Sequence, residues 1–517
     1  QEPEGEPVGP LIPLVGRRDV YLRLREIWEQ VLAGQTRLTL VGGEAGVGKT
    51  RVIKSFLDAT TSRHRSVVLK GRGYELAPEI PYLTLLEVLR NALAEEEDRA
   101  RAVVTGLSGE DVRALSRLLP ELADLRPEVT GSILLATPAA RLAVFGAVGR
   151  FLAGLRRGRD GGPGEPLVLF FDDLHFADPA SFDLLEHLLQ ELGGFPFWII
   201  ASVRPEDVQA EHRLPVIARR EAAAGRLDEL PVGRLDRAAI AEVAVSLVGE
   251  DQAPELARFL AEHGAGLPLA LAELINYLWD EGALTAQSAS RWSLAHPLDS
   301  DPPVLPPGGL DALILRRIRR LPNSTRRLAT LAAVIGQSFD PDLLQDAAEE
   351  HPAVVEIGLE VMLRRWLVRQ LAPYWTSNRR QPDIVLWAKG GRRGSFEFAH
   401  KMIRKALYRD IDPARRRVVH LQMAEGLEKL WGDASAQVCE ALAYHFLAAG
   451  QDERALPYLE KSAERARFLM AGETARRYAE QALAAVERLA TAEGRAGRER
   501  WHGRRGELEE LRDRQRV

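Results

Sequence analysis

Residues 36–51 read TRLTLVGGEAGVGKTR, and this stretch decides the fold of the region around it. A β-rich run leads into the glycine loop Gly43-x4-Gly48-Lys49-Thr50, and helical periodicity resumes directly after the loop. Glycines allow backbone amides to turn inward around an anion, and the helix N-terminus adds a partial positive charge. The stretch therefore predicts a phosphate-binding loop between a strand and a helix.

The residues of this loop have predicted roles toward a nucleotide. Lys49 is expected to reach the β and γ phosphates of ATP, and Thr50 is expected to offer its hydroxyl to Mg2+. A glycine-rich turn that binds nothing is the alternative, and the flanking strand and helix argue against it. The predicted nucleotide contacts in this segment are Gly43, Gly46, Val47, Gly48, Lys49, Thr50 and Arg51.

A second apolar run, LVLFFDDLHFAD at residues 167–178, contains two adjacent acids. Asp172 stands where a magnesium-binding acid belongs, and Asp173 stands where a group that orients the attacking water belongs. A plain strand end that faces solvent is the alternative, and the phosphate loop decides against it. We expect structural roles for His175 and Asp178.

Two further segments supply predicted contacts. FWIIASVRPED (197–207) places Arg204 at the end of a buried strand, where it can sense the γ-phosphate; a solvated strand end is the alternative. Gly266-Leu267-Pro268 opens a helix, so Pro268 is predicted to contact the nucleotide from a helical lid; a simple proline turn is the alternative. The predicted catalytic residues are Lys49, Asp172, Asp173 and Arg204, and the predicted metal ligands are Thr50 and Asp172.

The apolar runs alternate with helical stretches along the first half of the chain. This order predicts an α/β fold whose parallel sheet is buried on both faces. Residues 236–281 read as wholly helical, and the Pro-rich passage at 295–309 marks a boundary. Besides the strand before the phosphate loop, the predicted strands are 65–72, 166–174, 197–204 and 227–232. A helix is predicted at 21–34, and a loop at 156–166.

The second half of the chain predicts two all-helical or mostly helical bodies. Helices at 311–320, 324–336 and 352–366, followed by two strands of a hairpin within 367–398, are the order of a winged helix. From Ala414 the pattern is helical to the chain end. Three residue pairs 20 to 22 positions apart predict one helix per unit, without a full 34-residue period: Phe446 with Phe468, Gly450 with Gly472, and Tyr458 with Tyr478.

These patterns divide the chain into five predicted segments, the last of which is either truncated or capped by its Arg/Glu-rich tail. They are a linker (1–13), a P-loop NTPase core (14–233), a helical lid (234–294), a winged-helix domain (295–413) and TPR-like helical repeats (414–517).

Composition narrows the class of protein. A length of 517 residues favours two to four domains, and 46% hydrophobic residues without a charge-free apolar stretch of about 20 argue against a membrane span. The single cysteine, Cys439, fits the reducing cytoplasm. Lys and Arg number 69 against 74 Asp and Glu, so the whole chain has no bias that demands nucleic acid. The opening QEPEGEPVGP is expected to be a cut inside a linker.

Taken together, these motifs resemble the STAND group of P-loop ATPases, in particular the bacterial transcriptional regulators of that group. LVGRRD (14–19) looks like the group's N-terminal motif, DDLHFAD like its Walker B segment, SVRPED like sensor 1 and GLP like its lid motif. The resemblance implies that Val15, Gly16 and Arg17 lie near the adenine. Arg18 and Val20 depart from the pattern, since Glu is common at both positions.

The resemblance extends to the predicted winged helix. FEFAHKMIRKALYRDIDPARRRVVH (396–420) is similar to a segment whose His reads the β-phosphate of ADP in related ATPases, which implies that role for His400. Packing or helix capping is the alternative for this histidine. Lys401 stands where the family favours Asp.

The sequence thus predicts a slowly hydrolysing ATPase that acts as a signal-transduction switch, closed with ADP and open and self-associating with ATP. Its cofactors are ATP or ADP and Mg2+. The helical repeats are expected to bind an inducer, which is a small molecule or a protein, and DNA is expected to be reached through an output domain outside this sequence. The predicted location is the cytoplasm, without a membrane.

Two other classes of function remain open at this point. A DNA-engaging, initiator-like ATPase is favoured by the arginine clusters in LRRIRRLPNSTRR, RRGS and ARRRVV, for which solvated or internally paired helix faces are the alternative. A nucleotide-locked scaffold for a protein partner needs no hydrolysis, and Asp172, Asp173 and Arg204 argue against it. A small-molecule kinase is disfavoured because nothing resembles an acceptor pocket.

Overall fold

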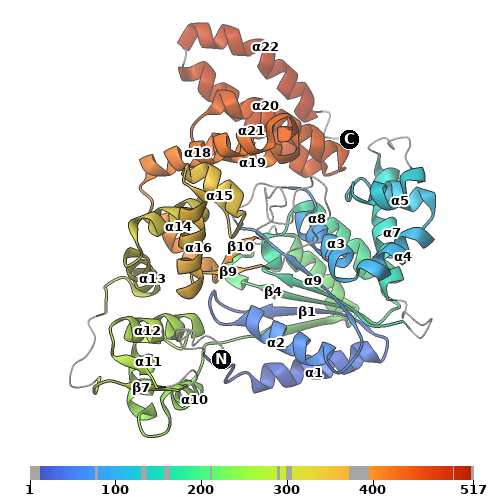
Figure 1. Ribbon diagram of the computed structural model, residues 1–517. Helices are drawn as coiled ribbons and strands as arrows, with labels where there is room; N and C mark the ends of the chain where they lie inside the picture. Colours follow the sequence, from blue (N-terminus) through green and yellow to red (C-terminus); the bar gives the residue numbers. More distant parts are fainter. Residues whose placement is uncertain are drawn as a thin grey trace.

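A five-stranded parallel sheet lies at the centre of the computed structural model, in the order β2-β3-β4-β1-β5 (Figure 1). The predicted parallel sheet is confirmed. Its strands are β1 (Thr36–Gly42), β2 (Val67–Arg72), β3 (Leu167–Asp172), β4 (Phe197–Val203) and β5 (Leu227–Pro231). The structure describes residues 12–75, 80–129, 137–156, 164–209, 212–287, 291–298, 305–371, 395–492 and 494–513.

The central strands are apolar along their length because helices cover both faces of the sheet. Leu169 and Phe171 of β3 belong to the core that includes the helices of one face, whereas Val168 and Phe170 pack with α1 and α2 on the other. Successive side chains of a strand point to opposite faces, so a strand covered twice has no solvent-facing position. These helices are α1 (Arg18–Leu32), α2 (Lys49–Thr61), α3 (Leu83–Glu95), α7 (Pro138–Leu155), α8 (Pro179–Glu191) and α9 (Arg213–Ala223).

Among the described residues, α7 is the helix that is long and apolar enough by composition to cross a membrane. Half of it is buried inside the protein, and its Val144, Val148 and Phe151 belong to the main core. This burial is the pattern of a core helix. Short helices lie beside it or between the strands: α4 (Glu97–Gly106), α5 (Gly109–Leu115), α6 (Leu122–Leu125), η1 (Pro127–Val129), η2 (Leu174–Phe176) and η3 (Pro205–Asp207).

Three helices and a short hairpin follow the sheet and share a hydrophobic cluster of their own. They are α10 (Arg237–Val248), α11 (Ala253–Gly264), α12 (Pro268–Asp280), β6 (Leu284–Ala286) and β7 (Trp292–Leu294). The helical pattern predicted for 236–281 is confirmed, and the hairpin after it was not predicted. We call this region the lid.

The next region, called here the third body, combines helices with a three-stranded antiparallel sheet in the order β8-β10-β9. β9 and β10 pair as the predicted hairpin requires, while residues 372–394 between them lie outside the described part. α15 and β8 were not predicted. The elements are α13 (Gly309–Arg319), α14 (Asn323–Ile335), β8 (Ser338–Phe339), α15 (Pro341–Ala348), α16 (Pro352–Arg364), β9 (Val368–Gln370), β10 (Phe396–Phe398) and α17 (Lys401–Asp410).

The rest of the described chain is a helical array that begins against the third body and returns to the core. α18 packs on α14 and α15, and α21 contacts α8 of the core. Beside that contact, the Arg117 guanidinium lies 4.8 Å from the centre of the Phe468 ring and 3.5 Å from Met470 Sδ. The array comprises α18 (Pro413–Trp431), η4 (Gly432–Val438), α19 (Cys439–Ala448), α20 (Asp452–Phe468), α21 (Gly472–Ala492) and α22 (Gly494–Asp513), in orange and red in Figure 1.

The three predicted pairs of array residues fall at similar places in successive helices, with one difference in burial. Gly450 lies between α19 and α20, and Gly472 begins α21. Phe446 is fully buried, whereas its counterpart Phe468 is 39% exposed at the end of α20. One helix per unit therefore describes the spacing better than identical packing does.

Candidate nucleotide-binding site

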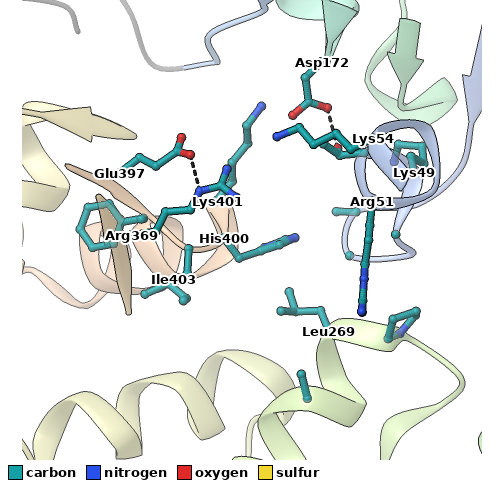
Figure 2. A pocket seen from close by; sticks show the side chains of 18 of the residues that line it. Lys49, Arg51, Lys54, Asp172, Leu269, Arg369, Glu397, His400, Lys401 and Ile403 are labelled. Carbon is teal, nitrogen blue, oxygen red and sulfur yellow. Dashed lines mark hydrogen bonds and ion pairs between the residues drawn. The ribbon is translucent and has the colours of Figure 1, made fainter. Parts of the chain in front are cut away.

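A cavity of about 780 Å3 opens at the carboxyl ends of the strands, between the core, the lid and the third body (Figure 2). All three regions contribute side chains to its wall. The predicted site residues that line it are Gly46, Gly48, Lys49, Thr50, Arg51, Asp172, Asp173, Arg204, Pro268 and His400. Val15, Gly16, Arg17, Gly43 and Val47 do not line it.

The phosphate loop adopts the backbone that its glycines permit. Gly46 and Gly48 have φ of 81° and 96°, in the left-handed region where a side chain is strained. Lys49 Nζ donates to the carbonyls of Gly43 at 2.6 Å and Glu44 at 2.8 Å. Burial lowers the pKa of Lys49, against the opposing effect of Asp173. The ammonium therefore lies over the loop, where a phosphate would also contact it.

Thr50 and Asp172 form a compact oxygen cluster at the loop. Thr50 Oγ1 donates to Asp172 Oδ1 at 2.6 Å, and Ser202 Oγ donates to the same oxygen at 2.7 Å. Burial opposes ionisation of Asp172, but Lys401, Arg72 and these two hydroxyls hold the pKa of its carboxyl well below the usual range. An ionised carboxylate beside a hydroxyl is the ligand chemistry of Mg2+, so the residues fit the predicted metal.

Asp173 is the most constrained of the predicted catalytic residues. Its backbone has φ 53° and ψ 50°, a left-handed conformation that costs a residue with a side chain about 1–3 kcal/mol. Its N–H donates to Ser202 Oγ at 2.7 Å, which helps to fix it. Its Oδ2 accepts from Arg204 Nη2 at 3.3 Å and from Lys401 Nζ of the third body. Burial opposes ionisation, yet Lys401 and Arg204 lower the pKa of Asp173.

Arg204 lies at the end of β4, buried beside the two acids. Its guanidinium contacts Asp173 and lies 5.6 Å from the centre of the Phe176 ring. Its Nη1 is also 3.4 Å from an oxygen of Asp207 and 4.0 Å from one of Glu75. The cation is therefore held in place at the cavity wall and is not a solvated strand end.

His175 and Asp178 have the structural roles expected for them. Asp178 caps α8: its Oδ1 accepts from Ser181 N at 2.9 Å, and the same oxygen accepts from Tyr82 N at 2.9 Å. His175 Nδ1 accepts from Arg204 N at 3.4 Å, and burial lowers the pKa of the imidazole to about 4.

The N-terminal motif fastens the loop to the lid. Arg17 Nη2 donates to the Val47 carbonyl at 2.8 Å. Gly16 has φ 63°, and a Cβ there would lie 2.7 Å from Ala239 Cβ of α10. The cavity wall on this side is formed by Ile12, whose carbonyl accepts from Arg51. The motif thus lies behind the cavity wall.

The lid reaches the loop through its predicted GLP turn. Pro268 is the first residue of α12, and Leu269 N donates to the Gly46 carbonyl at 3.3 Å. Proline at the first helical position loses no hydrogen bond, so the free N–H of the next residue can turn to the loop. The proline turn is therefore present and Pro268 lines the cavity, while its contact with a nucleotide stays a prediction.

His400 caps a helix, which is one of its two alternative roles, and lines the cavity; contact with a β-phosphate stays a prediction. Its Nδ1 accepts from Met402 N at 3.1 Å and so caps α17, and its ring points into the cavity (Figure 2). Burial, Lys401 and Arg204 lower the pKa of His400 to about 4, so the ring is neutral near pH 7. With Nδ1 as acceptor, the proton is on Nε2, where it can be donated to a phosphate oxygen.

Several cavity residues were not predicted from the sequence. Arg72 Nη1 is 2.7 Å from Glu397 Oε2, and Arg369 holds the other oxygen of that carboxylate. Arg317 and Glu273 form a buried pair at 3.0 Å between the third body and the lid. These pairs join segments far apart in the chain, and no motif indicates them. Only the position of Lys54 could have been inferred from the sequence, because it follows Thr50 by one helical turn and so lies on the same face of the helix.

Comparisons with known proteins agree with a P-loop site. The AAA ATPase domain family matches residues 13–200. An uncharacterized protein of Rhizobium meliloti (strain 1021) is 23% identical over 487 residues, which make up 91% of this chain and 42% of that protein. The chain thus spans less than half the length of this curated relative.

Two solved structures match this chain at low sequence identity. A Signal Transduction ATPase with Numerous Domains protein with a tetratricopeptide repeat sensor, from Pyrococcus horikoshii, is 13% identical, with 95% of this chain and 57% of that chain covered and a TM-score of 0.46. Cdc6p from Pyrobaculum aerophilum is 12% identical, with 78% and 97% covered and a TM-score of 0.34.

The domain match and the site geometry define the class of protein. Residues 13–200 hold the glycine loop, Asp172, Asp173 and most of β4. The chain carries an AAA-type P-loop ATPase domain.

Proposed function

We propose that the protein is a nucleotide-dependent signal-transduction switch that hydrolyses ATP slowly. ADP holds the third body against the core, and ATP releases it for self-association. The observation that carries the proposal is the contact of Lys401 Nζ with Asp173 Oδ2, which joins residues 228 positions apart. A side chain of the third body thereby holds the acid that hydrolysis requires.

Asp173 can orient an attacking water only when its carboxylate is free to accept a hydrogen bond from that water. In this arrangement Lys401 and Arg204 use the carboxylate and lower its pKa, which makes it a weaker base. Arg204 is available to the γ-phosphate once Asp173 is released, and Lys49 and His400 are available to the β-phosphate. Mg2+, when bound at Thr50 and Asp172, neutralises charge on the phosphate oxygens.

A switch requires that ATP and ADP bind the two arrangements differently. A factor of about 10⁴, or roughly 5.5 kcal/mol, moves such an equilibrium almost completely. The γ-phosphate and its attacking water need the space next to Asp173 that Lys401 occupies. This competition supports ATP as the nucleotide that opens the protein.

The remaining regions support a regulatory role. Helices with antiparallel strands in the third body support a winged helix, and the successive packed helices of the array support TPR-like repeats. We propose the five segments predicted from the sequence as domains, with the array as the binding site of an inducer. A role in bacterial transcription, in the cytoplasm, through an output domain that reaches DNA, belongs to the same proposal.

The structure offers less support for a DNA-engaging ATPase. Five of the six arginines of the first cluster make ion pairs within the chain: Arg316 and Arg320 with Glu281, Arg317 with Glu273, Arg319 with Asp410, and Arg327 with Glu350. Arg416 donates to the carbonyls of Tyr408 and Ile411. RRGS lies mostly outside the described residues. A salt-dependent gel shift with random duplex DNA would favour this second class.

The test of the switch combines phosphate release with molecular mass. Lys401→Met keeps the length of the side chain and removes its charge, so we expect release to rise about tenfold, the effect of about 1.4 kcal/mol on the barrier. Lys401→Arg is the matched control that keeps the charge, and Asp173→Asn should abolish release. Wild-type mass should increase from ADP to a non-hydrolysable ATP analogue. Unchanged release in Lys401→Met, or equal masses in both nucleotides, contradicts the proposal.

A further inference from the structure

Lys54 extends into the cavity from α2, one helical turn after Thr50. Residues four apart on a helix share a face, and the Cα–Cβ bond leans toward the helix N-terminus. The side chain of Lys54 therefore runs back toward the level of Thr50 and Asp172. Figure 2 shows it below Asp172, directed toward the third body.

Lys54 differs from the other cations of this cavity in having no close partner. In the described part of the chain its ammonium makes no hydrogen bond or ion pair. The other lysines and arginines of the wall all contact an acceptor: Lys49 with Gly43 and Glu44, Arg51 with Ile12, Arg72 and Arg369 with Glu397, Arg204 and Lys401 with Asp173, and Arg317 with Glu273.

An unpaired ammonium in a half-buried position is unfavourable, and its surroundings indicate what would stabilise it. Burial lowers the pKa of Lys54, and Arg369 and Arg72 lower it further. Asp172 and Glu397 oppose this effect from a distance. The local field therefore lacks a negative charge next to Lys54, and an anionic ligand would supply it.

We infer that Lys54 binds the terminal phosphate of ATP and makes the site discriminate ATP from ADP. The inference rests on the proposed function. Thr50 and Asp172 would hold the Mg2+ that accompanies the phosphates, and Lys54 lines the same cavity one helical turn after Thr50. ATP differs from ADP only by the γ-phosphate, so a cation that contacts this group alone separates the two nucleotides.

The same contact links the nucleotide to the third body. In this structure Glu397 of the third body is one of two carboxylates that balance Lys54. A γ-phosphate bound to Lys54 neutralises the charge of its ammonium in place of Glu397, and it adds a second negative charge near Glu397. Glu397 is then repelled, which weakens its hold on Arg72 and favours release of the third body.

The test measures the dissociation constants of ADP and of a non-hydrolysable ATP analogue, both with Mg2+, for wild type and two variants. For Lys54→Gln we expect affinity for the ATP analogue to fall about 10- to 100-fold, as for one charged hydrogen bond, and affinity for ADP to change less than about threefold. Lys54→Arg keeps the charge and should restore most of the preference. Arg63→Gln removes one exposed charge just after α2 and should leave both affinities unchanged.

Three outcomes overturn the inference: equal losses for both nucleotides in Lys54→Gln, no loss for either, and a loss of preference in Lys54→Arg as large as in Lys54→Gln. Circular dichroism and thermal unfolding establish whether each variant is folded. If Lys54→Gln is unfolded, Lys54→Arg still provides a test. The mass of the wild-type protein in the two nucleotides separates failure of the switch from failure of this inference. If the wild-type protein changes mass between the two nucleotides while Lys54→Gln keeps its preference for the ATP analogue over ADP, only the role of Lys54 is overturned.

Discussion

Two regions close over the same phosphate loop, and they are held to the core by different chemistry. The lid is held by a backbone hydrogen bond from Leu269 to Gly46 and by the close packing of Gly16 on Ala239, with one exposed ion pair, Arg234 with Glu44, that contributes little. The third body is held by ion pairs: Lys401 with Asp173, Arg72 with Glu397, and Lys405 with Glu75.

This difference decides which region a nucleotide can move. A backbone hydrogen bond and an apolar contact have no anionic competitor in the cavity. The acids that hold the third body do have one, because a phosphate group competes with Asp173 and Glu397 for the same cations. The lid is therefore expected to stay with the core, and the third body to leave it.

The largest effect is expected at the pair that joins the lid to the third body. Glu273→Leu leaves the buried Arg317 without its partner, which costs about 3–5 kcal/mol of stability. The double variant with Arg317→Leu should be less destabilised than the single one. Chemical denaturation in ADP measures both. If the third body leaves the lid in ATP, the penalty of Glu273→Leu should shrink in an ATP analogue; an equal penalty in both nucleotides would mean that these two regions move together.

A second prediction concerns the packing of the lid on the core. Gly16→Ala and Gly34→Ala both place a side chain at positive φ, for which the cost is about 1–2 kcal/mol. Only at Gly16 does the new Cβ meet another atom, so overpacking should add about 1–3 kcal/mol there. The difference between the two unfolding free energies isolates the lid contact. Equal losses would show that the lid is loosely held, which removes one side of the comparison.

The smallest effect is expected at the more exposed ion pair of the third body. Lys405 and Glu75 are 17% and 29% exposed and 2.7 Å apart. Glu75→Gln should cost about 0.2–1 kcal/mol, and the cost should decrease as salt is added. Unfolding at low and high ionic strength measures it. A loss larger than that of Gly16→Ala would place the main attachment of the third body outside the phosphate end of the cavity.

The central fold could be predicted because its signals are local. The β-rich runs and the glycine loop are contiguous in the sequence, and the strand ends at Asp172 and Arg204 then meet at one sheet edge by geometry alone. α15 and β8 of the third body were missed because they are short and take their conformation from tertiary packing. The hairpin of β6 and β7 was missed for the same reason.

The site was only partly predictable, for a related reason. Lys401 and Glu397 contact Asp173 and Arg72 across 228 and 325 residues, and nothing in a charged residue indicates which distant partner it will find. The N-terminal motif shows the opposite case. Val15, Gly16 and Arg17 were recognised as a motif; they do not line the cavity, Arg17 and Gly16 contact the loop and the lid, and their position near the adenine stays a prediction.

The return of the array to the core makes the molecule a closed ring. The core contacts the third body, and the third body packs against α18 of the array. The array then returns to the core, where α21 contacts α8 and where Phe468 and Met470 contact Arg117 of the core. The third body and the array each contact the core, and each contact keeps the residues of the other contact close to their partners. Two weak contacts therefore act as one strong attachment. Loosening the array from α8 therefore lowers the avidity of the third body for Asp173, at a distance from the nucleotide and without any change in the cavity.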